Sequence, residues 1–208
     1  MLKREDLRLY LCTDQLLAMG RPITQVVEQA IAGGVTMVQV REKDASTKDF
    51  YQAACAIATI CKTAGIPLVV NDRIDIALAV GAQGVHLGQS DMPLPVARRL
   101  VGENMFIGIS VSTLKEALEA QQNGADYLGV GAVYPTGSKK DVESVVGLEG
   151  LAEICGAVTI PAVAIGGVNK GNAAVIMKTG TAGVAVISAI LSQPDIEVAA
   201  RALGDALK

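Results

Sequence analysis

The feature that most constrains the fold of this chain is a series of short apolar runs, β-branched or punctuated by glycine, that recur along its length. Runs of this kind are typical of strands that are buried on both faces of a parallel sheet. We therefore predict eight strands, at residues 9–13, 36–40, 67–71, 84–88, 106–110, 127–131, 161–165 and 183–187.

Helix signals lie between most of these runs. Ser46 and Thr113 each precede an acidic residue by three positions, which is the spacing of an N-cap and the third helical residue. Gly65 and Gly124 fall where a helix needs a left-handed residue after its last turn. Helices and strands are therefore expected to alternate.

The alternation predicts a closed (β/α)₈ barrel, a TIM barrel, in one domain covering residues 1–208. A weak internal repeat supports it, because glycines at 81, 124 and 180 each end a helix shortly before a strand. No linker rich in Pro or Ser divides the chain. The alternative is an open, doubly wound sheet, since short apolar runs can be assigned to both architectures.

Composition narrows the possible partners. Hydrophobic residues make up 50% of the chain but form no run long enough to cross a membrane, and the N-terminus lacks the pattern of a secretory signal, so a cytoplasmic location is expected. The net charge of −3 and the 3% aromatic content offer neither a basic stripe nor stacking platforms for nucleic acid. We interpret the four cysteines as reduced core residues, and we expect small-molecule partners.

Polar residues gather where the predicted strands end, which is the rim that carries the chemistry of (β/α)₈ barrels. Alternation along the second strand predicts that Gln39, Arg41 and Lys43 face one side. Further polar residues follow the third, fourth and fifth strands, namely Asn71, Asp72, Gln89, Asp91 and Ser110. The sixth strand opens into a long loop of the kind that often binds ligands.

Asp72 and Asp91 end adjacent strands, and two oxygen ligands without nearby His or Cys suit Mg²⁺ that shares its other positions with a substrate phosphate. The alternatives are that Asp72 is a turn residue paired with Arg73, and that Asp91 only starts the helix after Pro93.

Basic residues on the same rim predict a phosphate site. Arg41, Lys43 and Lys139 are the candidate donors, and the alternative is a solvated rim of charge, which is favoured more for Lys140. Gly166 and Gly167 are expected to precede a helix and expose backbone amides to an anion; the alternative is a tight turn.

His86 is the only histidine and lies inside its strand rather than in a loop. We therefore expect a hydrogen-bonded structural role for this side chain.

Several motifs occur in order over nearly the whole chain: "VQVREK", "VVNDRIDIALAVGAQGVHLGQSDMP", "IGISV", "VYPTGSKKD", "IPAVAIGGV" and "GVAVISAI". In this combination the chain resembles the thiamine phosphate synthase family. The resemblance implies condensation of hydroxymethylpyrimidine diphosphate with a thiazole phosphate, giving thiamine monophosphate and pyrophosphate. It also implies that the diphosphate leaves early, with Mg²⁺, and that the thiazole nitrogen captures the resulting pyrimidine-methyl cation.

The same resemblance assigns roles to residues. Arg41, Lys43, Ser110 and Lys139 are the implied catalytic residues, and Asp72 and Asp91 the implied Mg²⁺ ligands. The implied contacts of the pyrimidine diphosphate are Gln39, Arg41, Lys43, Asn71, Ser110 and Lys139. Val40 and Glu42 are further implied substrate-binding residues. The implied contacts of the thiazole phosphate are Thr136, Gly137, Ser138, Gly167, Ile187 and Ser188.

One position departs from the family pattern, because Ser112 stands where related sequences often carry His. The similar thiazole tautomerases rely on that His, so this alternative is disfavoured, as retention of Asp72, Asp91 and Lys139 also indicates. A third alternative is a non-catalytic binder of phosphate ligands on the same barrel. The sequence leaves open whether the chain forms a homo-oligomer.

Overall fold

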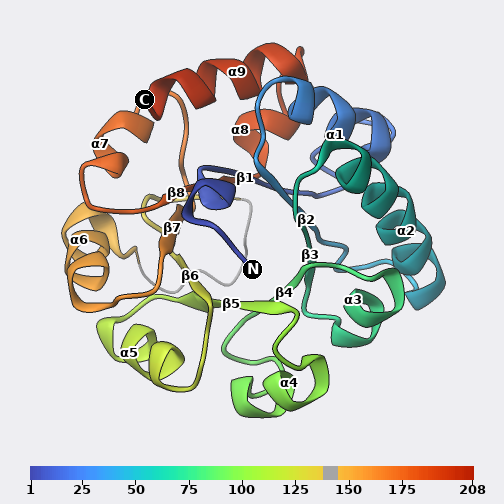
Figure 1. Cartoon of the computed structure of the whole chain (residues 1–208). Helices are drawn as coiled ribbons and strands as arrows, with labels where there is room; N and C mark the ends of the chain where they lie inside the picture. Colours follow the sequence, from blue (N-terminus) through green and yellow to red (C-terminus); the bar gives the residue numbers. More distant parts are fainter. Residues whose placement is uncertain (138–144) are drawn as a thin grey trace.

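Eight parallel strands close into a barrel in the computed structural model, which describes residues 1–137 and 145–208 (Figure 1). Each strand pairs with the next in the sequence, and β8 pairs with β1. The strands are β1 (Leu9–Cys12), β2 (Met37–Val40), β3 (Leu68–Asn71), β4 (Gly84–Leu87), β5 (Phe106–Val111), β6 (Tyr127–Val130), β7 (Ala162–Ile165) and β8 (Gly183–Val186).

The predicted (β/α)₈ barrel is confirmed, and the open sheet is excluded. All eight apolar runs are strands, with ends within one residue of the predicted ones. The prediction succeeds because strands enclosed by both the barrel interior and the helices bury nearly every side chain, so that they appear as short apolar blocks.

Helices cover the outer face of the barrel (Figure 1). A short 3₁₀ helix, η1 (Arg4–Leu7), precedes β1 and lies over the end of the barrel where the strands begin, with Leu7 fully buried. The α-helices are α1 (Ile23–Ala32), α2 (Thr47–Ala64), α3 (Ile74–Val80), α4 (Leu94–Val101), α5 (Leu114–Gln122), α6 (Gly147–Ala157), α7 (Ala173–Met177), α8 (Ser188–Leu191) and α9 (Ile196–Ala206). None of the described helices is long and apolar enough to cross a membrane.

The predicted helix caps are present. The Ser46 and Thr113 side chains accept hydrogen bonds from the backbone N–H groups of Asp49 and Glu116, at the starts of α2 and α5. Gly65 ends α2 in the left-handed conformation, with φ of 71°. These local signals determine where α2 and α5 begin and where α2 ends before the next strand.

The barrel interior places rings over glycines of other strands. A Cβ on Gly108 would lie 2.1 Å from the Tyr127 ring, and one on Gly84 would lie 2.1 Å from the Phe106 ring. The backbone register pairs Gly108 with Tyr127 and Gly84 with Phe106. Glycine on one strand therefore provides the volume that the ring on the next strand fills.

The cysteines follow the predicted pattern in part. Cys12 and Cys61 are buried, whereas Cys55 and Cys155 are only partly buried, and none of these four described residues forms a disulfide. Burial raises the pKa of the Cys61 thiol to about 12, so this side chain behaves as an apolar core residue.

Candidate active site

A small cavity lies inside the barrel toward the ends of the strands. Its volume is about 20 Å³, which is room for a water molecule but not for a substrate. The lining residues are Tyr10, Cys12, Gln39, Asn71, His86, Ser110, Gly129, Val163, Ile165 and Ala185. Three of the predicted substrate contacts, Gln39, Asn71 and Ser110, therefore come from different strands to one cavity.

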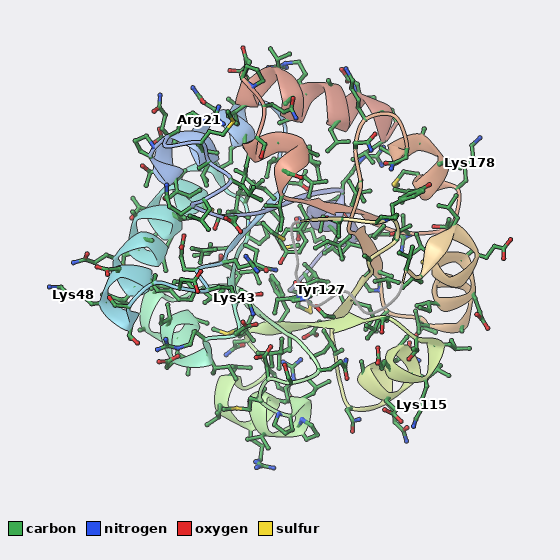
Figure 2. All side chains as sticks on the ribbon, turned by 180° about the vertical axis from the view of Figure 1, so that it is seen from behind. Arg21, Lys43, Lys48, Lys115, Tyr127 and Lys178 are labelled. Carbon is green, nitrogen blue, oxygen red and sulfur yellow. The ribbon has the colours of Figure 1, made fainter. Side chains whose placement is uncertain are left out.

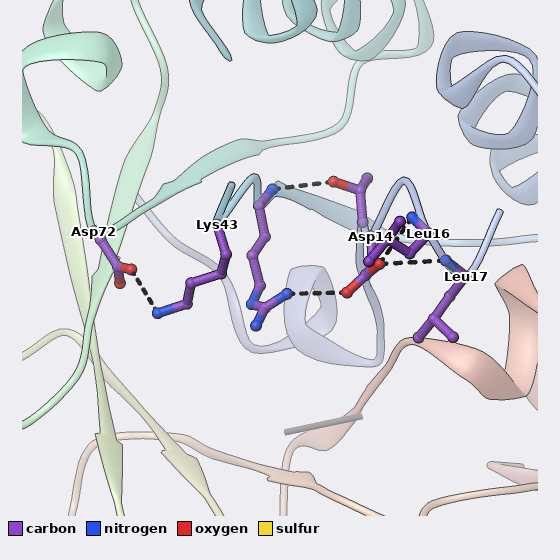
Figure 3. A network of polar contacts seen from close by, with 7 residues as sticks. Asp14, Leu16, Leu17, Lys43 and Asp72 are labelled. Atoms are coloured by element: carbon purple, nitrogen blue, oxygen red, sulfur yellow. Dashed lines mark hydrogen bonds and ion pairs between the residues drawn. The ribbon is translucent and has the colours of Figure 1, made fainter. Parts of the chain in front are cut away.

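Arg41 is held beside this region by the loop after β1. Its guanidinium group lies 3.1 Å from the Asp14 carboxylate, and both side chains are mostly buried, with exposed fractions of 12% and 18% (Figure 3). Asp14 also accepts hydrogen bonds from the backbone N–H groups of Leu16 and Leu17. The carboxylate thus fixes the loop and the arginine together.

Lys43 points in the opposite direction, toward the end of β3. Its ammonium group lies 3.2 Å from the Asp72 carboxylate, and its side chain is 54% exposed (Figure 3). In the view from behind, Lys43 lies over the barrel while Lys48 and Lys178 extend from the surrounding helices (Figure 2). The predicted alternation stops early, because β2 ends at Val40 and leaves Arg41 and Lys43 on a loop.

Asp72 occupies an unusual backbone conformation at the end of β3, with φ of 61°. Non-glycine residues seldom adopt this left-handed region, and when they do they often mark functional sites. Burial raises the pKa of the Asp72 carboxyl, the neighbouring Asp91 carboxyl adds to the increase, and Lys43 opposes it. The two predicted metal ligands are therefore close enough to interact.

The structural alternatives for the two carboxylates are resolved in part. Arg73 pairs with Asp75 through two hydrogen bonds of 2.9 and 2.6 Å, so Asp72 does not depend on Arg73. Asp91 accepts a hydrogen bond of 2.6 Å from the Gly88 backbone N–H and closes a turn before α4. Asp91 thus has a structural contact as well as its proximity to Asp72.

No group of three or more His, Cys, Asp or Glu side chains suited to a metal occurs within residues 1–137 and 145–208. A pair of carboxylates is nevertheless the set that Mg²⁺ commonly takes from a protein when substrate phosphates and water complete its shell. The pair at Asp72 and Asp91 matches that donor chemistry, because the two mutually repelling acids lie beside each other.

Asp72→Asn should raise the thermal stability of the metal-free protein by roughly 2–4 °C, the shift that about 1 kcal/mol produces at this size. Asn tolerates the left-handed backbone and removes a carboxylate that is costly to ionise beside Asp91. The raised pKa means that this cost is absent when both folded and unfolded states are protonated at low pH. The cost should grow as pH rises from the unfolded-state pKa of this carboxyl to its raised native pKa, and should stay constant above that.

Thermal unfolding of both proteins from pH 3 to pH 7, with chelator, measures this difference. The control is Asp75→Asn, because Arg73 lowers the pKa of the Asp75 carboxyl and the ion pair stabilises the folded state above the ordinary pKa. A metal-free Asp72→Asn protein that is less stable than the unsubstituted protein at pH 7 would contradict the expected repulsion.

Two neighbours of Arg41 that were predicted to bind substrate differ in their access to a ligand. The Val40 side chain is fully buried, so only its backbone is available there. Glu42 is partly buried, and burial followed by the charge of Asp14 raises the pKa of its carboxyl. Neither side chain lines the cavity.

The predicted thiazole site is described only in part. Ser138 and Lys139 lie outside the described residues, as does Lys140, whereas Thr136 and Gly137 end the described part of the loop after β6. Ile187 is buried and Ser188 is exposed at the start of α8.

Gly166 and Gly167 follow β7 with φ values of 92° and 67°, but they do not lead directly into a helix. The next helix, α7, begins only at Ala173, so the predicted alignment with a helix dipole is wrong. A Cβ on Gly167 would lie 2.6 Å from the Tyr134 Cβ and 2.8 Å from the Pro135 carbonyl. Glycine is required here because the loop after β6 approaches this backbone closely.

His86 has the predicted hydrogen-bonded environment, with its two ring nitrogens 2.8 Å from the Tyr127 hydroxyl and 2.9 Å from the Ser110 hydroxyl.

Three residues near the predicted site were not predicted from the sequence: Asp14, Tyr10 and Tyr127. The acid in "CTD" follows a strand and so gave a usable signal for Asp14. The tyrosines lie within apolar runs and gave none.

Comparison with known proteins identifies the family. A family model described as "Thiamine monophosphate synthase" matches residues 9–190. This chain belongs to the thiamine monophosphate synthase family. The predicted family and class of enzyme, a transferase, are confirmed.

Curated thiamine-phosphate synthases and a solved structure match nearly the whole of this chain. The curated thiamine-phosphate synthase of Clostridium botulinum (strain 657 / Type Ba4) is 55% identical over 195 residues, covering 94% of this chain and 95% of the relative. The corresponding protein of Clostridium tetani is 50% identical, covering 97% and 96%. The structure titled thiamine phosphate pyrophosphorylase from Pyrococcus furiosus has a TM-score of 0.90 and 44% identity, covering 98% of this chain and 96% of that chain.

Proposed function

We propose that this member of the thiamine monophosphate synthase family condenses hydroxymethylpyrimidine diphosphate with a thiazole phosphate. The bond between the pyrimidine-methyl carbon and the diphosphate oxygen breaks, and the electron pair leaves with pyrophosphate. The thiazole nitrogen then donates its lone pair to the methyl carbon, giving thiamine monophosphate. The reaction is a transfer of the pyrimidinylmethyl group with early departure of the diphosphate.

The observation that carries this proposal is the proximity of Asp72 and Asp91, beside Lys43 and at the same rim as Arg41. Two carboxylates and two cations around the ends of β2 to β4 are what a magnesium diphosphate requires. Asp72 and Asp91 would hold Mg²⁺, which would supply positive charge that favours departure of the diphosphate. The family match to known synthases supports the same reaction.

The protein's own side chains supply the remaining parts of the chemistry. The cations of Arg41 and Lys43 stabilise negative charge that grows on the leaving group, since each can hydrogen-bond to phosphate oxygens. Gln39, Asn71 and Ser110 orient the pyrimidine above the cavity. The pocket must also exclude water from the reactive pyrimidine-methyl cation.

The thiazole phosphate is proposed to bind the opposite part of the rim. Its proposed contacts are Thr136, Gly137, Ser138, Gly167, Ile187 and Ser188, with Lys139 reaching the departing diphosphate. The close contact of the Gly167 backbone with Tyr134 and Pro135 supports this assignment, because it joins the loops after β6 and β7.

Pyrophosphate release tests the function directly. We expect pyrophosphate only when both substrates and Mg²⁺ are present, together with an equal amount of thiamine monophosphate. Omission of either substrate or addition of chelator is the control. A protein that binds both ligands but releases no pyrophosphate would be a non-catalytic binder.

Ser112→His should leave condensation within about twofold of the unsubstituted rate, because Ser112 begins the cap region of α5 and is not among the predicted substrate contacts. The Ser112 amide and hydroxyl both donate to the Glu116 carboxylate, at 2.6 and 3.1 Å, which indicates a role at the start of α5. Condensation and thiazole isomerisation are measured for both proteins. If only the His variant is active, and only as an isomerase, the tautomerase alternative is correct.

A further inference from the structure

A chain of hydrogen-bonded side chains crosses the barrel interior between two predicted substrate contacts. The Gln39 amide nitrogen donates to the Tyr10 hydroxyl at 2.6 Å, and the Tyr10 and Tyr127 hydroxyls are 3.0 Å apart. The Tyr127 hydroxyl is 2.8 Å from His86 Nδ1, and His86 Nε2 is 2.9 Å from the Ser110 hydroxyl. Tyr127 lies near the centre of the barrel, which is where such a chain has to pass (Figure 2).

Packing holds the central part of this chain in one geometry. Tyr10 and Tyr127 are 1% and 0% exposed, and their rings meet edge to face at 6.1 Å. A Cβ on Gly129 would lie 3.0 Å from the His86 ring, so the imidazole occupies space left by that glycine. These rings cannot turn away without opening a cavity, and the hydrogen bonds therefore persist.

The chain of hydrogen bonds has one direction, because each side chain in it has only a limited number of protons to donate. Burial raises the pKa of Tyr10 and of Tyr127, so each phenol carries one proton and donates one hydrogen bond. A neutral imidazole likewise donates from one nitrogen and accepts at the other. Each buried phenol proton also needs an acceptor, and the hydrogen bonds of Tyr10 and Tyr127 within the described residues go only to members of this series. The hydrogen bonds therefore all run the same way, either from Gln39 to Ser110 or in reverse.

The contact at Gln39 sets the direction. Since its amide nitrogen donates to Tyr10, Tyr10 donates to Tyr127, and Tyr127 donates to His86 Nδ1. The imidazole proton then lies on Nε2 and is donated to the Ser110 oxygen. Gln39 is left with its carbonyl oxygen for a ligand, and Ser110 with its hydroxyl proton.

We propose that Tyr10, Tyr127 and His86 are positioning residues that couple Gln39 to Ser110, so that the site offers an acceptor at one end and a donor at the other. This pair complements an aminopyrimidine, whose amino group donates and whose ring nitrogen accepts. The same pair disfavours binding of the 4-oxo analogue, because that analogue has an accepting carbonyl in place of the amino group and a donating N–H in place of the ring nitrogen. The inference rests on the proposed function, because it takes the pyrimidine as the ligand of Gln39 and Ser110.

The test is Tyr127→Phe, since Tyr127 lines no part of the cavity and can act on the ligand only through its neighbours. Calorimetry measures the dissociation constants of the aminopyrimidine diphosphate and of its 4-oxo analogue, with Mg²⁺. Without the Tyr127 hydroxyl, His86 can take the other tautomer, and the Ser110 hydroxyl can then donate to His86 instead of accepting from it. The preference for the amino ligand should fall on the order of ten-fold, about the value of one hydrogen bond.

The matched control is Thr181→Val, which also removes one buried hydroxyl with two partners, the carbonyls of Ala162 and Gly183. It should leave the preference unchanged. Tyr10→Phe interrupts the same chain at a second place and should lower the preference as Tyr127→Phe does, which keeps the test valid if one variant folds poorly.

The outcomes separate the two proposals. An unsubstituted protein that binds neither pyrimidine diphosphate contradicts the proposed function. If it prefers the amino ligand and both Tyr→Phe variants keep that preference, the function stands and the coupling through the chain is wrong. An equal loss in Thr181→Val would also contradict the coupling, because ordinary destabilisation would then explain the effect.

Discussion

Asp72→Asn and Asp91→Asn should each lower turnover by on the order of 10²-fold at limiting Mg²⁺, with the fold intact. The two carboxylates interact with each other, and each variant removes one of the two charges proposed to hold the cation. A loss of this size corresponds to one electrostatic contact made in the transition state. Initial rates over a Mg²⁺ titration give both the maximal rate and the concentration needed to reach half of it.

Asp75→Asn is the matched control, because Asp75 lies on the same segment but pairs with Arg73 and is 64% exposed. It should leave the Mg²⁺ titration unchanged. The metal assignment fails if the two other variants also keep the unsubstituted Mg²⁺ dependence. Higher thermal stability of Asp72→Asn combined with lower turnover would show that the carboxylate is retained for chemistry at the expense of folding.

Arg41→Ala should reduce turnover on the order of 10²-fold or more, and Arg41→Lys should recover only part of it. The guanidinium group can give two parallel hydrogen bonds to phosphate oxygens, whereas an ammonium group acts as a single charge. The alanine variant also leaves the mostly buried Asp14 carboxylate without its cation. Single-turnover rates and separate binding measurements for the pyrimidine diphosphate distinguish effects on chemistry from effects on affinity.

Arg73→Ala is the control for Arg41, since Arg73 lies after the adjacent strand and binds Asp75 and Thr47. Its removal should change turnover by less than about twofold. If Arg41→Ala and Arg73→Ala have equally small effects, Arg41 is only part of the ion pair with Asp14. Loss of binding without loss of single-turnover rate would limit Arg41 to holding the substrate.

The sequence predicted the barrel closely because its strands are buried on both sides and its helices carry local signals at their ends. Each predicted strand matched within a residue, and the caps at Ser46 and Thr113 formed as expected. The path after a strand was less predictable. Neither the loop that carries Arg41 and Lys43 after β2 nor the absence of a helix directly after Gly167 was predicted from local signals.

The candidate site was predictable only where polar residues interrupt an apolar pattern. Asn71, Asp72 and Asp91 do so at the ends of runs, and the structure brings Asp72 and Asp91 close enough to interact. Tyr10 and Tyr127 sit inside such runs, as ordinary strand residues do. That their hydroxyls meet depends on two strands far apart in sequence facing each other across the barrel, which no local pattern contains.

The fit between ring and glycine inside the barrel has a consequence for how sequences of this fold can diverge. A larger residue at Gly108 collides with the Tyr127 ring, and a smaller residue at Tyr127 leaves the space above Gly108 empty. Neither position is therefore free to change by itself. Selection acts on the combined volume of the pair, so homologues should drift at 108 and 127 by compensating exchanges rather than by independent substitutions.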